Sequence, residues 1–291
     1  MMRAVPTARQ ILREAEKVFK KSEGFDHVHA GKELADAEEL LDFLLGREHD
    51  EDEEIDTATA SRFKRFARRR ATGEPNAYII GETTFHDLKL EVRPGAFIPR
   101  QSSEWMADQA IRRLRGRRKP VHVDLATGIG PVALVVGHAL PKARVIGADL
   151  SARPVSLARR NAAKLKLRNV TFVKGDLFRP VPRRLMGSVD VITIHPPYVG
   201  RREMRTLPFE ILQFEPEESL TDFSPLGDRI VRQVVTEAPQ WLRPDGWLLV
   251  EVSPDRSREV ATILRHAGFR DVRSTKGGVA VSRVVVGRSG G

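Results

Sequence analysis

Hydrophobic residues in the first third of the chain recur at helical spacing. The stretch ILREAEKVFKK (11–21) gathers its apolar residues on one face, and Thr7 with Gln10 fits a capping box ahead of it. A second helix is predicted over LADAEELLDFLLG (34–46), with Gly46 as its terminating residue. A third follows the acidic run DEDEEID, which suits the positive end of a helix dipole. These segments predict a small helical bundle.

The pattern changes between residues 71 and 100. Glycine and proline interrupt the stretch ATGEPNAYIIGETTFHDLKLEVRPGAFIPR, and FHDLKLEV (85–92) alternates apolar and polar residues like a strand. We interpret this stretch as a linker that contains a β-hairpin.

Strand and helix patterns alternate along the rest of the chain. Apolar strands such as VHVDL, ARVIGADL and VDVITI are separated by amphipathic stretches such as ARPVSLARRNAAKL. This alternation predicts a parallel, doubly wound α/β sheet. No helix pattern separates the last two strands, expected at 270–275 and 279–288, so we expect an antiparallel pair at the sheet edge.

Composition excludes several classes of protein. The chain has no cysteine, so disulfides, thiolate catalysis and cysteine-ligated zinc are excluded, and the scattered histidines suggest no metal site. We find no apolar run long enough for a membrane helix and no signal-peptide core, so we expect a cytoplasmic protein without membrane contact. The formal charge is +10, with basic clusters at 62–70, 112–119 and 200–205. These clusters are either solvated helix faces or a surface for RNA, the ribosome or an acidic protein.

A glycine turn follows the first strand of the predicted sheet. In VDLATGIGPVA, Asp124 ends the strand, and Gly128 with Gly130 lets backbone amides approach a ligand before the next helix. The following strand ends at Asp149, where a carboxylate can accept both hydroxyls of a ribose. The spacing also matches a looser dinucleotide fingerprint, which keeps a dehydrogenase as an alternative.

Two acidic residues favour S-adenosylmethionine over a dinucleotide. Asp124 precedes the turn, where a dinucleotide has no use for a carboxylate but S-adenosylmethionine offers an amino group. The third strand ends in GDLF, where Asp176 can meet an adenine amino group while Leu177 or Phe178 packs on the ring.

The fourth strand ends in His195-Pro196-Pro197-Tyr198. Two prolines cannot continue a central strand, because each lacks a backbone donor. Ligands of such sheets bind beyond the carboxyl ends of the strands, so this corner faces the same crevice as the glycine turn. A rigid turn there fixes a carbonyl that accepts a hydrogen bond from a substrate N–H, and Tyr198 supplies an aromatic wall.

These segments resemble the HemK-type methyltransferases, which methylate the side-chain amide nitrogen of a glutamine in peptide-chain release factors. The resemblance spans nearly the whole chain, including ADAEELLDFLLGRE, RRRATGEPNAYIIGETTFHDLKLEVRPGAFIPR, DLATGIGPVAL, FEPEESL and SRVVVGR. It implies a Rossmann-like class I methyltransferase at 105–291, a helical substrate-recognition domain at 1–75 and a hairpin linker at 76–104.

The resemblance also implies S-adenosylmethionine as the cofactor, a release factor as the partner, and specific site residues. The catalytic motif would be His195, Pro196, Pro197 and Tyr198. The cofactor would contact Asp124, Ala126, Thr127, Gly128, Gly130, Asp149, Leu150, Asp176, Leu177 and Phe178.

The chain departs from the family at three places. Ala126 stands where the family's Gly-Thr-Gly-Ser-Gly loop begins, and Gln101-Ser102-Ser103-Glu104 replaces Pro-Glu-Thr-Glu. His195 replaces the asparagine of Asn-Pro-Pro-Tyr. A neutral imidazole offers one lone pair to the acceptor amide, as the asparagine oxygen does, and can also serve as a general base. The alternatives are therefore a methyltransferase acting on a nucleic-acid base or a small molecule, and a weakened S-adenosylmethionine-binding homologue.

Overall fold

The computed structural model describes residues 5–27, 31–278 and 282–290, which divide into two compact units. The helical unit comprises residues 1–82 together with Thr206–Glu215, and the sheet unit comprises 83–205 and 216–291. The expected boundaries at 75 and 104 follow the sequence alone, so they do not anticipate that Thr206–Glu215 groups with the first helices. What each range does functionally stays a prediction.

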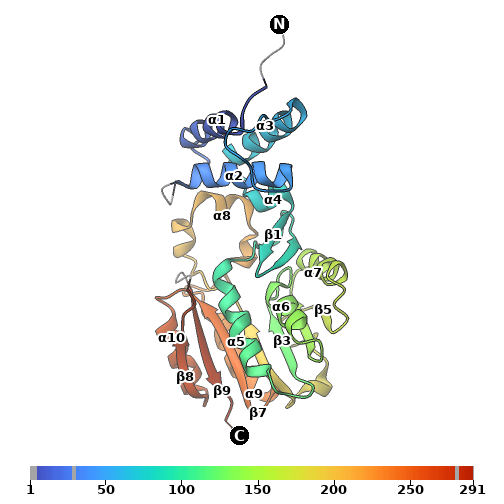
Figure 1. The fold of residues 1–291 in the computed structure, drawn as a ribbon. Coiled ribbons are helices and arrows are strands. Elements are labelled where there is room, and N and C mark those ends of the chain that lie inside the picture. Colours follow the sequence, from blue (N-terminus) through green and yellow to red (C-terminus); the bar gives the residue numbers. More distant parts are fainter. Residues whose placement is uncertain (1–4, 28–30, 279–281, 291) are drawn as a thin grey trace. The chain divides into compact units, whose positions relative to one another are not determined.

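The helical unit is built from α1 (Ala8–Lys20), α2 (Lys32–Leu45), α3 (Thr57–Ala71), α4 (Asn76–Ile80) and α8 (Phe209–Phe214) (Figure 1). The capping box at Thr7 and Gln10 is present, and Gly46 ends α2 in the left-handed conformation at φ 73°. Apolar faces of the first three helices meet in one core, which includes Phe19, Leu40, Leu41, Ile55 and Phe63.

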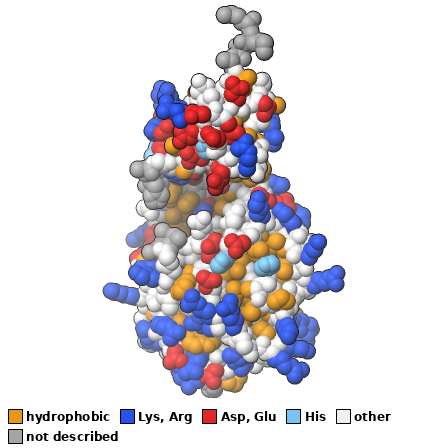
Figure 2. All heavy atoms as spheres, in the orientation of Figure 1, with side chains coloured by type: hydrophobic (Ala, Val, Ile, Leu, Met, Phe, Trp, Pro, Cys, Tyr) orange, Lys and Arg blue, Asp and Glu red, His pale blue; other side chains and the backbone are white. Residues whose placement is uncertain are grey.

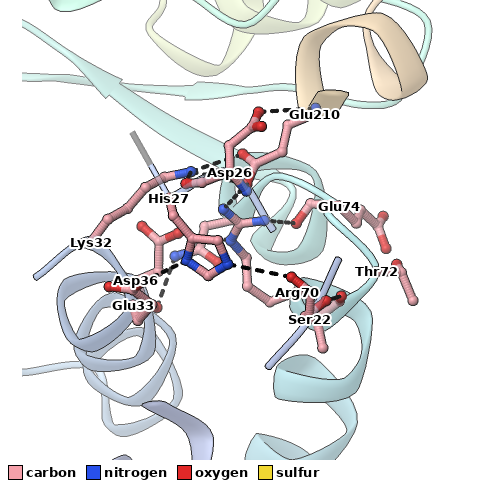
Figure 3. A network of polar contacts seen from close by, with 12 residues as sticks. Ser22, Asp26, His27, Lys32, Glu33, Asp36, Arg70, Thr72, Glu74 and Glu210 are labelled. Carbon is pink, nitrogen blue, oxygen red and sulfur yellow. Dashed lines mark hydrogen bonds and ion pairs between the residues drawn. The ribbon is translucent and has the colours of Figure 1, made fainter. Parts of the chain in front are cut away.

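A largely buried polar network joins α8 to α2, to α3 and to Asp26, which precedes α2 (Figure 3). Arg70, on α3, donates from Nε to Asp36 at 2.7 Å and from Nη2 to Glu210 at 2.6 Å. Lys32 Nζ also donates to both Glu210 oxygens, at 2.9 and 3.0 Å. Asp26 and Glu210 exchange backbone-to-carboxylate hydrogen bonds. Burial raises the pKa of the Asp36 carboxyl, with Arg70 opposing the shift.

The expected hairpin is formed by β1 (Glu82–Phe85) and β2 (Leu88–Glu91), and all of it except Glu82 belongs to the sheet unit. Its turn falls at His86, with φ 47°, and Asp87, so the alternating stretch FHDLKLEV contains a turn before the strand begins.

A seven-stranded mixed sheet follows, in the order β5-β4-β3-β6-β7-β9-β8. Its strands are β3 (Val121–Leu125), β4 (Arg144–Asp149), β5 (Val170–Lys174), β6 (Val189–Ile194), β7 (Leu242–Val252), β8 (Arg270–Thr275) and β9 (Arg283–Arg288). The first five pair in parallel, and β9 pairs antiparallel with both β7 and β8. The sheet therefore has the expected parallel core and antiparallel edge, although residues 279–281 of the last expected strand lie outside the described residues.

Helices cover the sheet in two groups (Figure 1). One group consists of α5 (Glu104–Leu114), α6 (Pro131–Ala139) and α7 (Ala152–Lys164), which contact one another. The other consists of α9 (Arg229–Trp241) and α10 (Ser257–His266), which pack with alternate strand residues such as Val123, Ile192 and Val250. Since strand residues alternate between faces, His122, Asp124, Thr193 and Glu251 lie on the opposite face.

Candidate active site

The glycine turn between β3 and α6 has two glycines with different requirements. Gly128 and Gly130 both have positive φ, of 58° and 86°. A Cβ on Gly130 would lie 2.4 Å from the Phe172 ring, whereas a Cβ on Gly128 would meet no atom within 4 Å. Gly130 is therefore needed for packing, and the open side of Gly128 leaves room for a ligand. Ala126 also has a positive φ, 49°, a conformation that glycine adopts more easily.

Asp124 is held by a chain of hydrogen bonds inside the sheet. Its carboxylate accepts from Thr127 Oγ1 at 2.5 Å and from Thr193 Oγ1 at 2.6 Å. Thr193 lies 2.8 Å from His122 Nε2, and burial lowers the pKa of His122 to about 3, so this imidazole is neutral at pH 7. Burial raises the pKa of Asp124 to about 6, with the two threonine hydrogen bonds opposing the shift.

Asp149 fixes the turn from the neighbouring strand. Its two oxygens accept hydrogen bonds from the backbone N–H groups of Gly128 and Ser151, each at 2.9 Å. Burial raises the pKa of the Asp149 carboxyl. The next residue, Leu150, is apolar but 63% exposed, and it lines the cavity described below.

The residues after β5 point in different directions. Asp176 and Leu177 line the cavity described below, and Leu177 has a left-handed φ of 45°. Phe178 is not among the lining residues, because its buried ring stacks on Trp241 at 5.3 Å in the sheet core. Phe178 is therefore placed as a core residue.

The His-Pro-Pro-Tyr corner continues directly from β6. His195 and Pro197 line the cavity, whereas Pro196 and Tyr198 do not. The Tyr198 ring stacks on the His195 imidazole, with centroids 5.8 Å apart. Burial, reinforced by the charge of Glu251, raises the pKa of Tyr198 to about 12, so the phenol stays protonated.

One cavity of about 160 Å³ collects most of these residues. Its walls include Asp124, Ala126, Thr127, Gly128, Asp149, Leu150, Asp176, Leu177, His195 and Pro197. Gly130 does not line it. Three other groups on its walls have no role predicted from the sequence. They are Gly95, Phe97, Pro99 and Arg100; Ser103 and Met106; and Pro216, Glu218 and Ser219. The first and third groups fall in the segments RPGAFIPR and FEPEESL, which carry the family resemblance. Ser103 belongs to Gln101-Ser102-Ser103-Glu104, where the chain departs from the family.

Several arginines of the basic clusters make contacts within the protein. Arg70 is buried, Arg117 pairs with Asp190 at 3.1 Å, and Arg113 lies over the Trp247 ring at 4.5 Å. On the face seen in Figure 2, Lys and Arg side chains of the sheet unit are dispersed. Among the described residues, no group of three or more His, Asp or Glu side chains could hold a metal ion. Within that part of the chain, no helix is long and apolar enough to cross a membrane.

Comparison with known proteins defines the class. Residues 119–268 match the model of a methyltransferase domain, and residues 10–81 match the PrmC N-terminal domain. The fold is similar to that of a T. thermophilus 16S rRNA methyltransferase solved with AdoMet and guanosine, with a TM-score of 0.53 and 16% identity over 72% of this chain and 49% of that one. The protein is a class I, Rossmann-like methyltransferase that uses S-adenosylmethionine.

Two curated relatives match along most of the chain. The release factor glutamine methyltransferase of Thermodesulfovibrio yellowstonii is 30% identical over 87% of this chain and 91% of its own length. The enzyme of that name from Yersinia pestis is 32% identical over 89% of this chain and 94% of its own length. The chain belongs to the release factor glutamine methyltransferase family.

Proposed function

We propose that this enzyme methylates the side-chain amide nitrogen of a glutamine in a peptide-chain release factor. One observation carries the proposal: the corner residues His195 and Pro197 open onto the same cavity as Asp124, Gly128 and Asp149. A site for an acceptor nitrogen and a site for the methyl donor therefore share one cavity. Membership of the family supports the choice of a release-factor glutamine as the acceptor.

The residues of the glycine turn fit S-adenosylmethionine. When bound, the cofactor supplies an electrophilic methyl group. The Asp124 carboxylate would hold its ammonium group, and the open side of Gly128 admits a close backbone approach. Asp149 would accept the ribose hydroxyls, Asp176 would meet the adenine amino group, and Leu150 with Leu177 would cover the ring.

The Pro-Pro corner would orient the acceptor. An amide nitrogen is a weak nucleophile, and fixing both of its N–H bonds directs it for in-line attack on the methyl carbon. A carbonyl of the rigid Pro196–Pro197 turn would accept one N–H and the His195 imidazole the other. Tyr198 would hold the imidazole plane by stacking on it.

We assign residues 1–75 to recognition of the release factor, 76–104 to the linker and 105–291 to the chemistry. The PrmC N-terminal match over residues 10–81 supports the first assignment. Contact of the basic clusters with a nucleic acid or the ribosome stays a prediction, as does a cytoplasmic location. The alternatives, methylation of a base or a small molecule and a homologue without activity, are not favoured by the named relatives.

The test uses the purified enzyme, methyl-labelled S-adenosylmethionine and a purified bacterial release factor. We expect label in the release factor, on one glutamine located by mass spectrometry, and none after that glutamine is replaced by glutamate. A parallel reaction with a cell extract is separated into protein, nucleic-acid and small-molecule fractions. Label confined to the nucleic-acid or small-molecule fraction would overturn the proposed substrate.

A further inference from the structure

The His195 imidazole is enclosed by residues that no motif singles out. The Phe97 ring contacts the imidazole edge-on, with centroids 5.7 Å apart, whereas the Tyr198 ring stacks nearly parallel to it. Its Nδ1 lies 3.4 Å from Ser103 Oγ and 3.8 Å from Glu251 Oε2. The two aromatic rings fix the plane of the imidazole, so these polar neighbours determine what Nδ1 does.

Glu251 comes from the neighbouring strand. Ile194 of β6 pairs with Val250 of β7, so the parallel register brings His195 beside Glu251 on the same face of the sheet. The Glu251 side chain is fully buried, with 0% exposure, and it does not line the cavity. Any influence on the acceptor must therefore pass through the imidazole.

One carboxylate oxygen of Glu251 is buried without a hydrogen-bond donor in the part of the chain that the structure describes. Ser102 Oγ donates to Oε1 at 3.3 Å, whereas Oε2 accepts no hydrogen bond from the described residues. A buried carboxylate oxygen without a donor is costly, and a proton on the imidazole Nδ1, 3.8 Å away, is attracted to it.

Two departures from the family meet at this point. Histidine replaces the asparagine of the catalytic motif, and Ser102 with Ser103 replaces part of Pro-Glu-Thr-Glu. Ser103 lies 92 positions before His195 in the sequence. Both serine hydroxyls contact the His195–Glu251 pair. The second departure therefore supplies polar support for the first.

We propose that Glu251 and Ser103 hold the His195 imidazole in the tautomer with its proton on Nδ1, so that Nε2 accepts a hydrogen bond from a carboxamide N–H of the acceptor. This inference rests on the proposed function for the identity of the acceptor. Ser103 alone would permit either tautomer, because a hydroxyl both donates and accepts. A carboxylate only accepts, so Glu251 selects Nδ1–H. Glu251 is a positioning residue, and its action preserves the acceptor role of the asparagine.

The tautomer can be measured without any substrate. Protein labelled with ¹⁵N-histidine is examined by NMR above pH 7, and the His195 signals are assigned by their loss in His195→Asn. We expect the proton on Nδ1 in the natural protein. Glu251→Gln should shift the population towards Nε2–H, because an amide can donate to Nδ1 as well as accept from it. A proton on Nε2 in the natural protein would overturn the proposal.

Turnover provides a second, independent arm. Losing one oriented hydrogen bond corresponds to a loss of roughly 10- to 100-fold in rate, so Glu251→Gln should lower kcat by about that factor and leave cofactor binding unchanged. In a His195→Asn background the same substitution should have almost no effect on kcat, since asparagine has no tautomer. An equal loss in both backgrounds would assign Glu251 a merely structural role.

The two arms separate this inference from the proposed function. If the natural protein carries the proton on Nδ1 but does not methylate a release factor, the tautomer assignment holds and the proposed substrate is wrong. Methylation of the release factor with Nε2–H in the natural protein would keep the substrate and remove the assignment.

Discussion

Glu210 accepts a 2.6 Å hydrogen bond from Arg70, a residue 140 positions earlier in the sequence. Glu210 lies in the segment Thr206–Glu215, which belongs to the helical unit although the residues on both sides of it belong to the sheet unit. The segment follows the Pro-Pro corner in the sequence and precedes Pro216, which lines the cavity. The segment between the Pro-Pro corner and Pro216 therefore contributes to the helical unit as well as to the sheet unit.

Replacing Arg70 should destabilise the helical unit strongly. Arg70 is 1% exposed, and Arg70→Met leaves the partly buried carboxylates of Asp36 and Glu210 without their shared cation. We expect a loss of about 3–5 kcal/mol in the free energy of unfolding, measured by urea denaturation. The control is Arg69→Met, because Arg69 is 44% exposed in its pair with Glu74 and should cost at most about 1 kcal/mol. Equal losses would contradict the role assigned to burial.

Acid should have opposite effects on cofactor binding and on stability through Asp124. Its pKa of about 6 in the folded protein exceeds the value of about 3.9 for an unfolded chain. The folded protein without ligand therefore binds the proton more tightly, and this group adds stability as the pH falls from about 7 to about 5.

Binding of an ammonium group requires the carboxylate form of Asp124. Affinity for S-adenosylmethionine should fall about tenfold between pH 7 and pH 5, as measured by calorimetry. Asp124→Asn should bind weakly, with affinity nearly constant over this range. A natural protein whose affinity is equally constant would show that Asp124 does not hold the ammonium group.

The two glycines of the turn should respond differently to alanine. Gly130→Ala places a Cβ against Phe172 and adds left-handed strain, which together cost about 2–4 kcal/mol of stability. Gly128→Ala carries only the strain, about 1–2 kcal/mol, but fills space beside the ligand. We therefore expect the larger loss in thermal stability from Gly130→Ala and the larger loss in cofactor affinity from Gly128→Ala. The reverse order would place the cofactor elsewhere.

Local patterns in the sequence predict much of this structure. The cap at Thr7 and the end of α2 at Gly46 depend only on residues that are close in the sequence, so the sequence alone is sufficient to predict them. The convergence of Asp124 and Asp149 follows from one rule, that parallel strands end at the same edge of a sheet.

Contacts between distant segments could not be predicted in this way. The pairing of Glu210 with Arg70 and the position of Glu251 beside His195 depend on which segments become neighbours, and no period in the sequence encodes that. The order of the strands could not be predicted either, because β9, the last strand in the sequence, lies between β7 and β8 in the sheet.

Phe178 shows the same limit at the scale of one side chain. The left-handed φ of 45° at Leu177 places Leu177 on the cavity wall and Phe178 in the core, a choice that the letters GDLF do not reveal. Phe178→Leu should therefore lower the free energy of unfolding by about 1–2 kcal/mol and leave the S-adenosylmethionine dissociation constant unchanged.

The matched variant is Leu150→Ala, which removes an exposed apolar side chain from the cavity wall. It should weaken cofactor binding about tenfold, because some apolar area is no longer buried against the ligand, and should hardly alter stability. Calorimetric titration and urea denaturation of both variants measure the two effects. Weaker cofactor binding by Phe178→Leu at unchanged stability would show that the Phe178 ring contacts the adenine. Unchanged cofactor affinity in Leu150→Ala would show that Leu150 does not contact it.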